Sequence, residues 1–204
     1  MGRTRRSWVC VGIAVLFALT ACGAGTDAVA RGQTFEFVSP GGQTQIFYDP
    51  PETRGKIPEL SGEDLLELGK QIRLSDYASK VVVLNIWGSW CGPCRAEMPH
   101  LQRVYDQTKD TGVQFIGIDV RDEQRSAPQD FVRDRGVTYP SIYDPAGRSL
   151  LALKGYPRSV VPSTIVLDRQ HRVAAIFLTA LLDTDLLPVV QRIAAEPTAQ
   201  GQPS

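Results

Sequence analysis

The sequence VVVLNIWGSWCGPCRAEMP, residues 81–99, carries the clearest structural signal in the chain. Its first seven residues form an almost unbroken run of β-branched and aromatic side chains, which is typical of a central strand buried on both faces. The residues from Cys91 or Pro93 to about Thr108 place apolar side chains at helical spacing. The stretch therefore predicts a buried strand that leads through a short turn into a helix, with a Cys-x-x-Cys pair at the junction.

The position of this pair predicts a reactive sulfur. A cysteine at the start of a helix lies beside unpaired backbone N–H groups and the positive end of the helix dipole, and both favour thiolate over thiol. Such settings lower a cysteine pKa from about 8.5 to between about 3.5 and 7.5. One helical turn separates the two sulfurs, so Cys94 can attack a mixed disulfide formed on Cys91 and release its product. We therefore predict that Cys91 attacks and Cys94 resolves.

The rest of the chain alternates strands with helices. Apolar runs predict strands over residues 72–74, 113–120, 139–143, 164–167 and 172–178, and helical patterns occupy 127–135, 149–154 and 185–195. Two short β-prone runs, 34–38 and 45–48, flank a Ser-Pro-Gly-Gly turn and predict an N-terminal β-hairpin. This order predicts an α/β domain over residues 34–195, with a mixed central sheet in a three-layer α/β/α arrangement, followed by a disordered tail over 196–204.

Composition and charge bound the function. The chain has 204 residues, with 22 basic and 22 acidic side chains and 43% hydrophobic content, which suits about one globular domain. A net charge of zero gives no basic excess to neutralise a phosphate backbone, so nucleic-acid binding is disfavoured. The four cysteines are Cys10, Cys22, Cys91 and Cys94. Their number alone leaves a disulfide framework, a metal site and a redox site open.

The first 33 residues predict export and tethering. Three arginines precede an apolar run over residues 8–19, which is the layout of a secretory signal and too short to cross a bilayer. The run ends in Leu-Thr-Ala-Cys at Cys22, which resembles a bacterial lipobox. On this interpretation residues 1–21 are a signal peptide, Cys22 is lipidated, and residues 22–33 form a flexible spacer rich in Gly, Ala and Thr. The alternative is an uncleaved N-terminal anchor, with Cys22 as a bystander.

Removal of the signal peptide would change both the net charge and the number of free cysteines. Cys10 leaves with the signal and Cys22 carries the lipid, so the mature domain keeps only Cys91 and Cys94 as thiols. Loss of three arginines leaves 19 basic against 22 acidic side chains, a net charge of −3. A single pair of cysteines two residues apart is no disulfide framework. A closed zinc site needs four ligands in a recognisable spacing, which the two histidines do not complete, so the pattern favours redox chemistry without a metal.

Two separated motifs carry a resemblance to a known family. Residues 83–99 resemble the active-site signature of thioredoxin-fold oxidoreductases, and in particular of the membrane-tethered TlpA/ResA-like branch. The match includes Trp90 before the first cysteine and Pro99 five residues after the second. Val161 and Pro162, before an apolar run, resemble the cis-proline loop of the family. The resemblance covers roughly residues 58–195 and implies a thioredoxin-like fold.

The resemblance also implies roles for the residues around the cysteines. Trp90, Gly92 and Pro93 would form the active-site turn, in which Trp90 shields the disulfide and touches the substrate. Pro162 would be cis, and Val161 would offer main-chain hydrogen bonds to a docked substrate. Residues 121–139 look like the insertion typical of the TlpA/ResA-like branch.

Three positions bear on proton transfer. Many cytoplasmic thioredoxins carry a buried aspartate where this chain has Asn85, and a lysine where it has Phe115, so the general-base role of that aspartate is vacant. Asparagine is common there in the tethered branch. Glu97 lies one turn beyond Cys94 and is a candidate base or pKa modulator. The alternative is that Glu97 stabilises a solvated helix face or a local ion pair.

The resemblance implies an extracytoplasmic, lipid-anchored thiol-disulfide oxidoreductase that acts on protein disulfides and needs no cofactor. In this branch a CcdA-type transmembrane protein supplies electrons, and the usual client is an apocytochrome c whose Cys-x-x-Cys-His motif must be reduced before haem attachment. Residues 34–48 also resemble actinobacterial cytochrome-biogenesis lipoproteins. The Gly-Pro dipeptide between the cysteines is that of thioredoxin, a reductant near about −270 mV, so we expect reduction of client disulfides.

Three other functions share part of this pattern. An oxidative folding catalyst or isomerase would have the same active-site residues and differ in redox potential. A copper-binding lipoprotein would hold Cu(I) with two thiolates, but such relatives have three residues between the cysteines and an additional histidine. A peroxidase would require Thr or Ser where this chain has Gly88. Of the remaining candidates, His100 and His171 are predicted to be ordinary surface residues and Trp87 a core residue.

Overall fold

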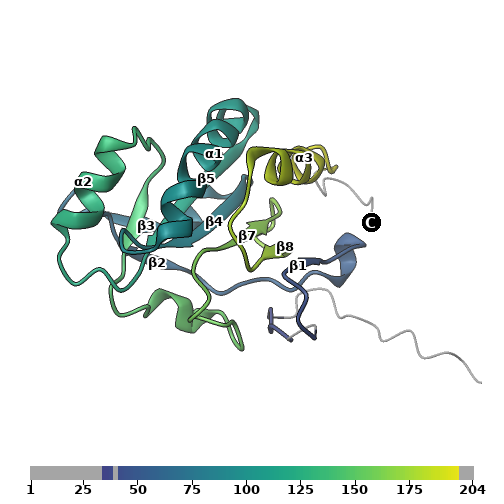
Figure 1. Cartoon of the computed structure of the whole chain (residues 1–204). Coiled ribbons are helices and arrows are strands. Elements are labelled where there is room, and N and C mark those ends of the chain that lie inside the picture. Colours follow the sequence, from purple (N-terminus) through teal and green to yellow (C-terminus); the bar gives the residue numbers. More distant parts are fainter. Residues whose placement is uncertain (1–33, 39–40, 198–204) are drawn as a thin grey trace, which may run out of the picture.

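A computed structural model describes residues 34–38 and 41–197. Its strands are β1 Gln45–Phe47, β2 Ser61–Glu63, β3 Gln71–Arg73, β4 Val81–Trp87, β5 Val113–Asp119, β6 Ser141–Tyr143, β7 Ser163–Leu167 and β8 Val173–Phe177. Six of them form one sheet in the order β1-β8-β7-β4-β5-β6, while β2 and β3 pair as a small separate sheet (Figure 1). β4, β5 and β6 are parallel and the other neighbours are antiparallel, so the predicted mixed central sheet is confirmed.

The three α-helices of the described residues pack on one face of this sheet (Figure 1). They are α1 Gly92–Thr108, α2 Ser126–Asp134 and α3 Asp183–Ala194. In the described residues, the opposite face is covered by extended segments and 3₁₀ turns. The 3₁₀ turns within the described residues are η1 Pro51–Thr53, η2 Leu74–Tyr77, η3 Lys109–Thr111 and η4 Ser149–Ala152, of which η2 and η4 contribute buried residues to this face. The helix predicted over 149–154 is a single 3₁₀ turn, Ser149–Ala152, which lies between a turn ending at Gly147 and the left-handed Gly155 (φ 75°). The prediction of two helical layers is corrected to one.

β4 is the central strand that the sequence predicts. All seven of its residues are buried, and their side chains alternate between two apolar clusters. Val83 and Trp87 face the helices, while Leu84 and Ile86 face the opposite side. Burial on both faces is what a continuous apolar run provides in a parallel sheet. β4 therefore holds the turn that follows it, and with it the two cysteines, at a fixed edge of the sheet.

The predicted N-terminal hairpin is wrong. β1 pairs with β8, and the segment 34–38 makes isolated contacts elsewhere. The N–H of Phe35 donates to the carbonyl oxygen of Lys56, and the N–H of Phe37 donates to that of Lys154. The physical reason is burial, because Phe35 is only 3% exposed in the core on the helix-free face, whereas a free hairpin would leave this ring in water.

A buried arginine joins both ends of the domain. The side chain of Arg54 is fully buried and pairs with Asp49 at 2.8 Å, with Asp168 at 3.3 Å and with Glu196 at 2.6 Å. A second Arg54 nitrogen also donates to Glu196, at 2.7 Å. Glu196, which the sequence assigns to the disordered tail, is therefore an ordered part of the domain. A buried guanidinium needs carboxylate partners, and the residue after α3 supplies one.

Replacement of this arginine by an apolar side chain of similar length is expected to destabilise the protein. Arg54→Met leaves Asp168 with Arg172 as its remaining ion-pair partner and should lower the free energy of unfolding by about 3 kcal/mol. Arg133→Met removes an exposed pair with Asp130 and should cost less than about 1 kcal/mol. Denaturant unfolding of both variants measures the difference. Equal losses would contradict the structural importance of the Arg54 cluster.

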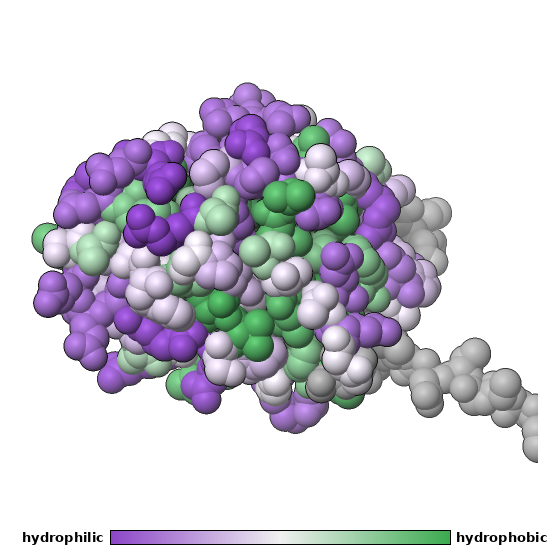
Figure 2. All heavy atoms as spheres, in the orientation of Figure 1, coloured by the Kyte–Doolittle hydropathy of each residue, from purple (hydrophilic) through white to green (hydrophobic). Residues whose placement is uncertain are grey.

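The signal peptide and spacer predicted over residues 1–33, including Cys22, lie outside the described residues, as does the tail from residue 198 onward. In the part of the chain that is described, no helix has the length and apolar character needed to cross a membrane. The surface in the orientation of Figure 1 shows apolar residues gathered near the middle of the visible face, with hydrophilic residues around them (Figure 2). A surface of this kind is typical of sites that bind other molecules.

Candidate active site

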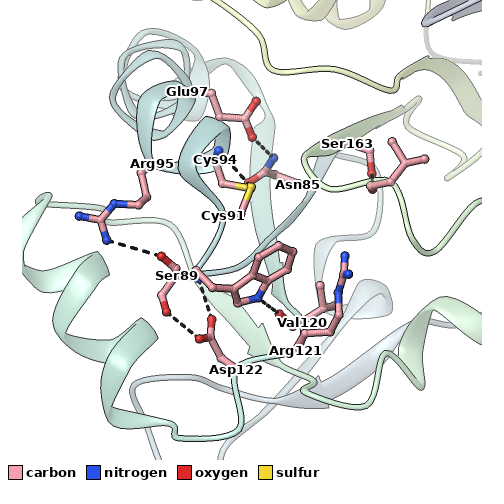
Figure 3. The surroundings of a disulfide bond; sticks show 12 residues. Asn85, Ser89, Cys91, Cys94, Arg95, Glu97, Val120, Arg121, Asp122 and Ser163 are labelled. Atoms are coloured by element: carbon pink, nitrogen blue, oxygen red, sulfur yellow. Dashed lines mark hydrogen bonds between the residues drawn. A yellow bond between two sulfur atoms is a disulfide. The ribbon is translucent and has the colours of Figure 1, made fainter.

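Cys91 and Cys94 form a disulfide at the start of α1 (Figure 3). Cys91 is the N-cap of the helix, and the backbone N–H of Cys94 donates to its Sγ at 3.2 Å. This donor is one of the N–H groups that a helix start leaves without a partner, and in the reduced protein it would stabilise a thiolate. Cys91 is 2% exposed and Cys94 is fully buried. An incoming thiolate therefore reaches the sulfur of Cys91 more readily than that of Cys94.

The turn before the disulfide is fixed by residues that follow β5. The backbone N–H of Ser89 donates to Asp122 at 2.7 Å and its hydroxyl donates to the same carboxylate at 2.6 Å. The indole Nε1 of Trp90 donates to the carbonyl oxygen of Val120 at 2.9 Å. Trp90 remains 47% exposed beside Cys91. The indole is thus held in place while one part of it stays open to a partner molecule.

Gly88 leaves no space for a side chain. A Cβ atom at this position would lie 2.3 Å from Trp90 Nε1 and 2.9 Å from the Val120 carbonyl oxygen. Gly92 and Pro93, which the sequence places in the active-site turn, are exposed in the first turn of α1. An added Cβ at Gly92 would meet nothing within 4 Å. The surface directly after Cys91 is therefore open.

The Val161–Pro162 peptide bond is cis, as the resemblance implies. Pro162 is buried and directly precedes β7, which pairs with β4. Val161 is half-buried and contacts both core clusters. The hydroxyl of Ser163 donates to the carbonyl oxygen of Val160 at 3.0 Å, which closes the loop (Figure 3). Docking of a substrate on the main chain of Val161 stays a prediction.

Glu97 lies beside the disulfide in the protein interior rather than on a solvated helix face (Figure 3). It is 1% exposed, accepts from Asn85 Nδ2 at 2.9 Å and accepts from the N–H of Leu181 at 3.1 Å. Burial raises the pKa of this carboxyl to about 7, against the lowering effect of the two hydrogen bonds. The ion-pair and solvated-face alternatives are wrong. Glu97 is a buried group that can gain or lose a proton near neutral pH.

Phe115 and the two histidines take structural positions. Phe115 is buried against Tyr105 and Tyr139. His100 lies 3.0 Å from Asp183, and the ring of His171 hydrogen-bonds the carbonyl oxygen of Tyr77. His171 is only 9% exposed, so its prediction as a surface residue is wrong. Within residues 34–38 and 41–197, no three His, Cys, Asp or Glu side chains are grouped so that they could hold a metal ion.

Three groups near the disulfide escaped sequence reasoning. Asp122 belongs to a charged cluster after β5, and the rule that parallel strands end at one sheet edge could have placed it near the turn after β4. Leu181 contributes only a backbone N–H, for which a sequence carries no signal. Asp119, at the end of β5, is fully buried, and burial together with Asp122 raises its pKa to about 9. The site therefore draws on four segments of the chain, namely residues 85–97, 119–122, 160–163 and Leu181.

Comparison with known proteins agrees with this geometry. The model of the AhpC/TSA family matches residues 54–176. Thiol-disulfide oxidoreductase ResA of Bacillus thuringiensis subsp. konkukian is 35% identical over 105 residues, which are 52% of this chain and 58% of the relative. ResA of Geobacillus kaustophilus is 33% identical over 118 residues, 58% of this chain and 66% of the relative. The chain thus spans about three fifths of the length of the curated relatives that it matches.

Two solved structures are similar over almost their whole length. A secreted thiol-disulfide isomerase from Corynebacterium glutamicum is 46% identical, with a TM-score of 0.77 over 81% of this chain and 100% of the other. A DsbF homologue from Corynebacterium diphtheriae is 50% identical, with a TM-score of 0.73 over 78% and 99%. With the mixed sheet and the cysteines at the start of α1, these matches establish the fold. The chain has a thioredoxin-like fold and belongs to the AhpC/TSA family.

Proposed function

We propose that this protein is an extracytoplasmic thiol-disulfide oxidoreductase of protein substrates, with Cys91 and Cys94 as its catalytic cysteines. The observation that carries the proposal is the disulfide at the start of α1, in which Cys91 is the N-cap residue and the N–H of Cys94 donates to its Sγ. A helix N-terminus favours the Cys91 thiolate, and the thiolate is the nucleophile in disulfide exchange. The curated relatives named thiol-disulfide oxidoreductase support the assignment, and a relative described as secreted supports the location.

The reaction follows from the order of the two sulfurs. In the reduced protein the Cys91 thiolate attacks one sulfur of a client disulfide, forms a mixed disulfide and releases the other client sulfur as a thiolate. Glu97 accepts the proton of the Cys94 thiol, and the Cys94 thiolate then attacks Cys91 Sγ. The second client sulfur leaves as a thiolate and is protonated from water. Two electrons have passed to the client, and the protein is left with the disulfide seen in the structure.

Gly88 argues against peroxidase chemistry. A peroxidase of this fold would require Thr or Ser three residues before the reactive cysteine, and this chain has Gly88 at that position. The contacts around Gly88 also exclude such a side chain, because a Cβ atom would overlap the Trp90 indole and the Val120 carbonyl oxygen. The site therefore fits disulfide exchange better than reduction of peroxides.

The finer proposal concerns tethering and client. Lipidation of Cys22 would hold the domain at the outer face of the cell membrane, and a CcdA-type membrane protein would return electrons to the Cys91–Cys94 disulfide. The client would be a disulfide-bonded protein such as an apocytochrome c. The N-terminal sequence pattern and the ResA-named relatives support this proposal. Loss of label from a radioactive fatty acid in a Cys22→Ser variant would support the lipid anchor, and unchanged labelling would refute it.

A second candidate is an oxidative folding catalyst or isomerase with the same residues. It is favoured by the 46% identity with a protein described as a secreted thiol-disulfide isomerase. The two candidates differ in the stability of the Cys91–Cys94 disulfide, which active-site residues alone do not fix. A copper-binding lipoprotein is the third candidate and predicts tight Cu(I) binding without reduction of any disulfide.

Equilibration of the protein with glutathione buffers is expected to give a reducing potential. A value near that of thioredoxin, about −270 mV, would favour the reductant, because a protein that donates electrons must lie below its clients. A value near about −120 mV, as in DsbA, would instead identify an oxidant. The fraction of oxidised protein, measured by alkylation and mass spectrometry across the buffers, gives the potential.

A further inference from the structure

Three exposed arginines surround the disulfide without an ion-pair partner in the described part of the chain. Arg95 follows Cys94 on α1, Arg121 follows β5, and Arg158 precedes the cis-proline loop. Figure 3 shows Arg95 and Arg121 on opposite sides of the turn that carries Ser89 and Cys91. Other arginines of the molecule do find carboxylates, as Arg125 does with Glu63 and Arg133 with Asp130. Arg73, Arg135, Arg148 and Arg169 also form no ion pair within the described residues, so what distinguishes Arg95, Arg121 and Arg158 is their place in the segments around the active-site turn and the cis-proline loop.

Arg121 is held in one place by its surroundings. Its guanidinium carbon lies 4.4 Å from the centre of the Trp90 ring, which is a cation–π contact. Its Nη2 donates to the carbonyl oxygen of Ser159 at 3.4 Å, and its backbone N–H donates to that of Pro145 at 3.1 Å. Its φ angle is +60°, a left-handed conformation that residues other than glycine rarely adopt. This arrangement places the charge between the active-site turn and the cis-proline loop.

Three carboxyls close to Arg121 in the fold are engaged elsewhere or buried, and Glu123, two residues further along the chain, is exposed and forms no ion pair with Arg121. The carboxylate of Asp122 accepts two hydrogen bonds from Ser89. The carboxylate of Asp144 accepts from the backbone N–H groups of Arg148 and Ser149 and from the Ser149 hydroxyl. Asp119 is fully buried, with a raised pKa that keeps it neutral at pH 7. None of these three carboxyls pairs with Arg121, so a partner's carboxylate can.

A small cavity of about 120 Å³ lies beside these groups. Arg121 and Arg158 both line it, together with Val120, Leu150 and the backbone turn at Gly147. A carboxylate that enters between two guanidinium groups gains charge-assisted hydrogen bonds from both. The half-exposed indole of Trp90 offers an apolar surface next to it. The chemistry that this surface fits is an acidic side chain next to an apolar one.

We propose that Arg121, with Arg158 and Arg95, forms a recognition site for acidic side chains close to the reacting cysteine of a client protein. The inference rests on the proposed thiol-disulfide exchange and adds a substrate class to it. A client protein must pass Trp90 for its cysteine to reach Cys91. The client residues next to that cysteine then lie over Arg121. Carboxylates there add about two- to fivefold to binding for each exposed charge pair.

The test compares two synthetic disulfide peptides that differ only in residues next to the cysteine, two Glu in one and two Gln in the other. The reduced wild-type protein should show a kcat/KM about tenfold higher for the Glu peptide at low salt, and the ratio should fall towards one at 1 M salt. Arg121→Gln combined with Arg158→Gln should bring the ratio to about one at low salt. Arg121→Lys should keep part of the preference, since it keeps the charge and loses the planar stacking.

Two controls separate charge recognition from redox chemistry. Lys109→Gln removes a positive charge at the other end of α1, about 25 Å away, and should leave the ratio unchanged. Reduction of bis(2-hydroxyethyl) disulfide, which is uncharged, should change less than twofold in all variants. A wild-type protein that turns over both peptides equally, or prefers the Gln peptide, overturns this inference alone. A folded, reduced protein that turns over neither peptide overturns the proposed function itself.

Discussion

Cys91→Ser is expected to lose turnover of protein disulfides by a factor on the order of a thousand or more, because it removes the nucleophile. A serine hydroxyl does not ionise at neutral pH and cannot form a mixed disulfide. Serine is also a favoured N-cap residue, so its oxygen can accept the Cys94 N–H in place of Cys91 Sγ and the helix start should persist. Circular dichroism of the variant checks the fold, and reduction of a model protein disulfide checks the activity.

Cys94→Ala is the matched variant, and it should separate the two sulfurs by role. It leaves the attacking Cys91 in place and removes the group that resolves the mixed disulfide. Client proteins should then accumulate as covalent adducts on Cys91 that a small thiol releases, and mass spectrometry identifies them. Apocytochromes among the adducts would support the cytochrome-maturation proposal, and their absence would count against it. Adducts on Cys91→Ser, with none on Cys94→Ala, would reverse the assigned roles.

The sequence predicts the strands and helices well where a single local pattern decides them. β4 and α1 follow from an unbroken apolar run and from helical spacing, and the structure places both within one or two residues of the prediction. The N-terminal runs at 34–38 and 45–48 are also β-prone. Their partners, Lys56, Lys154 and strand β8, are distant in sequence, so no local pattern distinguishes these pairings from a hairpin. Local propensity specifies an extended segment but not its neighbour.

The candidate site shows the same difference between features that a local pattern predicts and features that depend on distant segments. The cysteines and Trp90 lie in one short motif, which the sequence alone reveals. The burial of Glu97 is not visible in the sequence, because helical spacing alone leaves its side of α1 ambiguous, and the groups that cover it are the N–H of Leu181 and the side chain of Asn85. In the sequence, a glutamate in a polar stretch has the pattern of a solvent-exposed residue. Only the packing of α3 against α1 shows that the Glu97 side chain is buried. The functional importance of Glu97 is therefore a result of tertiary structure.

Glu97→Gln is expected to slow the second step of exchange by about a hundredfold at pH 7, since general bases contribute on this scale. An aromatic disulfide releases one coloured thiolate when Cys91 attacks and a second when Cys94 displaces it, so stopped-flow absorbance separates the steps. The first phase serves as the internal control and should change little. In the wild-type protein the second phase should rise with pH through about 7 as Glu97 ionises. In the variant this rise through pH 7 should be absent.

The pH dependence of the unfolding free energy of the oxidised protein measures the protonation of Glu97 independently of the kinetics. Glu97 has a pKa of about 7 in the folded protein and 4.5 in the unfolded chain, so between these values the folded state binds the additional proton. Stability from this group is complete below pH 4.5 and declines as the pH rises through 7, by about 3 kcal/mol in total. Glu97→Gln does not titrate, so its unfolding free energy should fall less than that of the wild type between pH 4 and pH 8. Parallel curves would mean that folding does not shift the pKa of Glu97. A divergence without any effect on the second kinetic phase would show that Glu97 holds a proton but does not accept the one from Cys94.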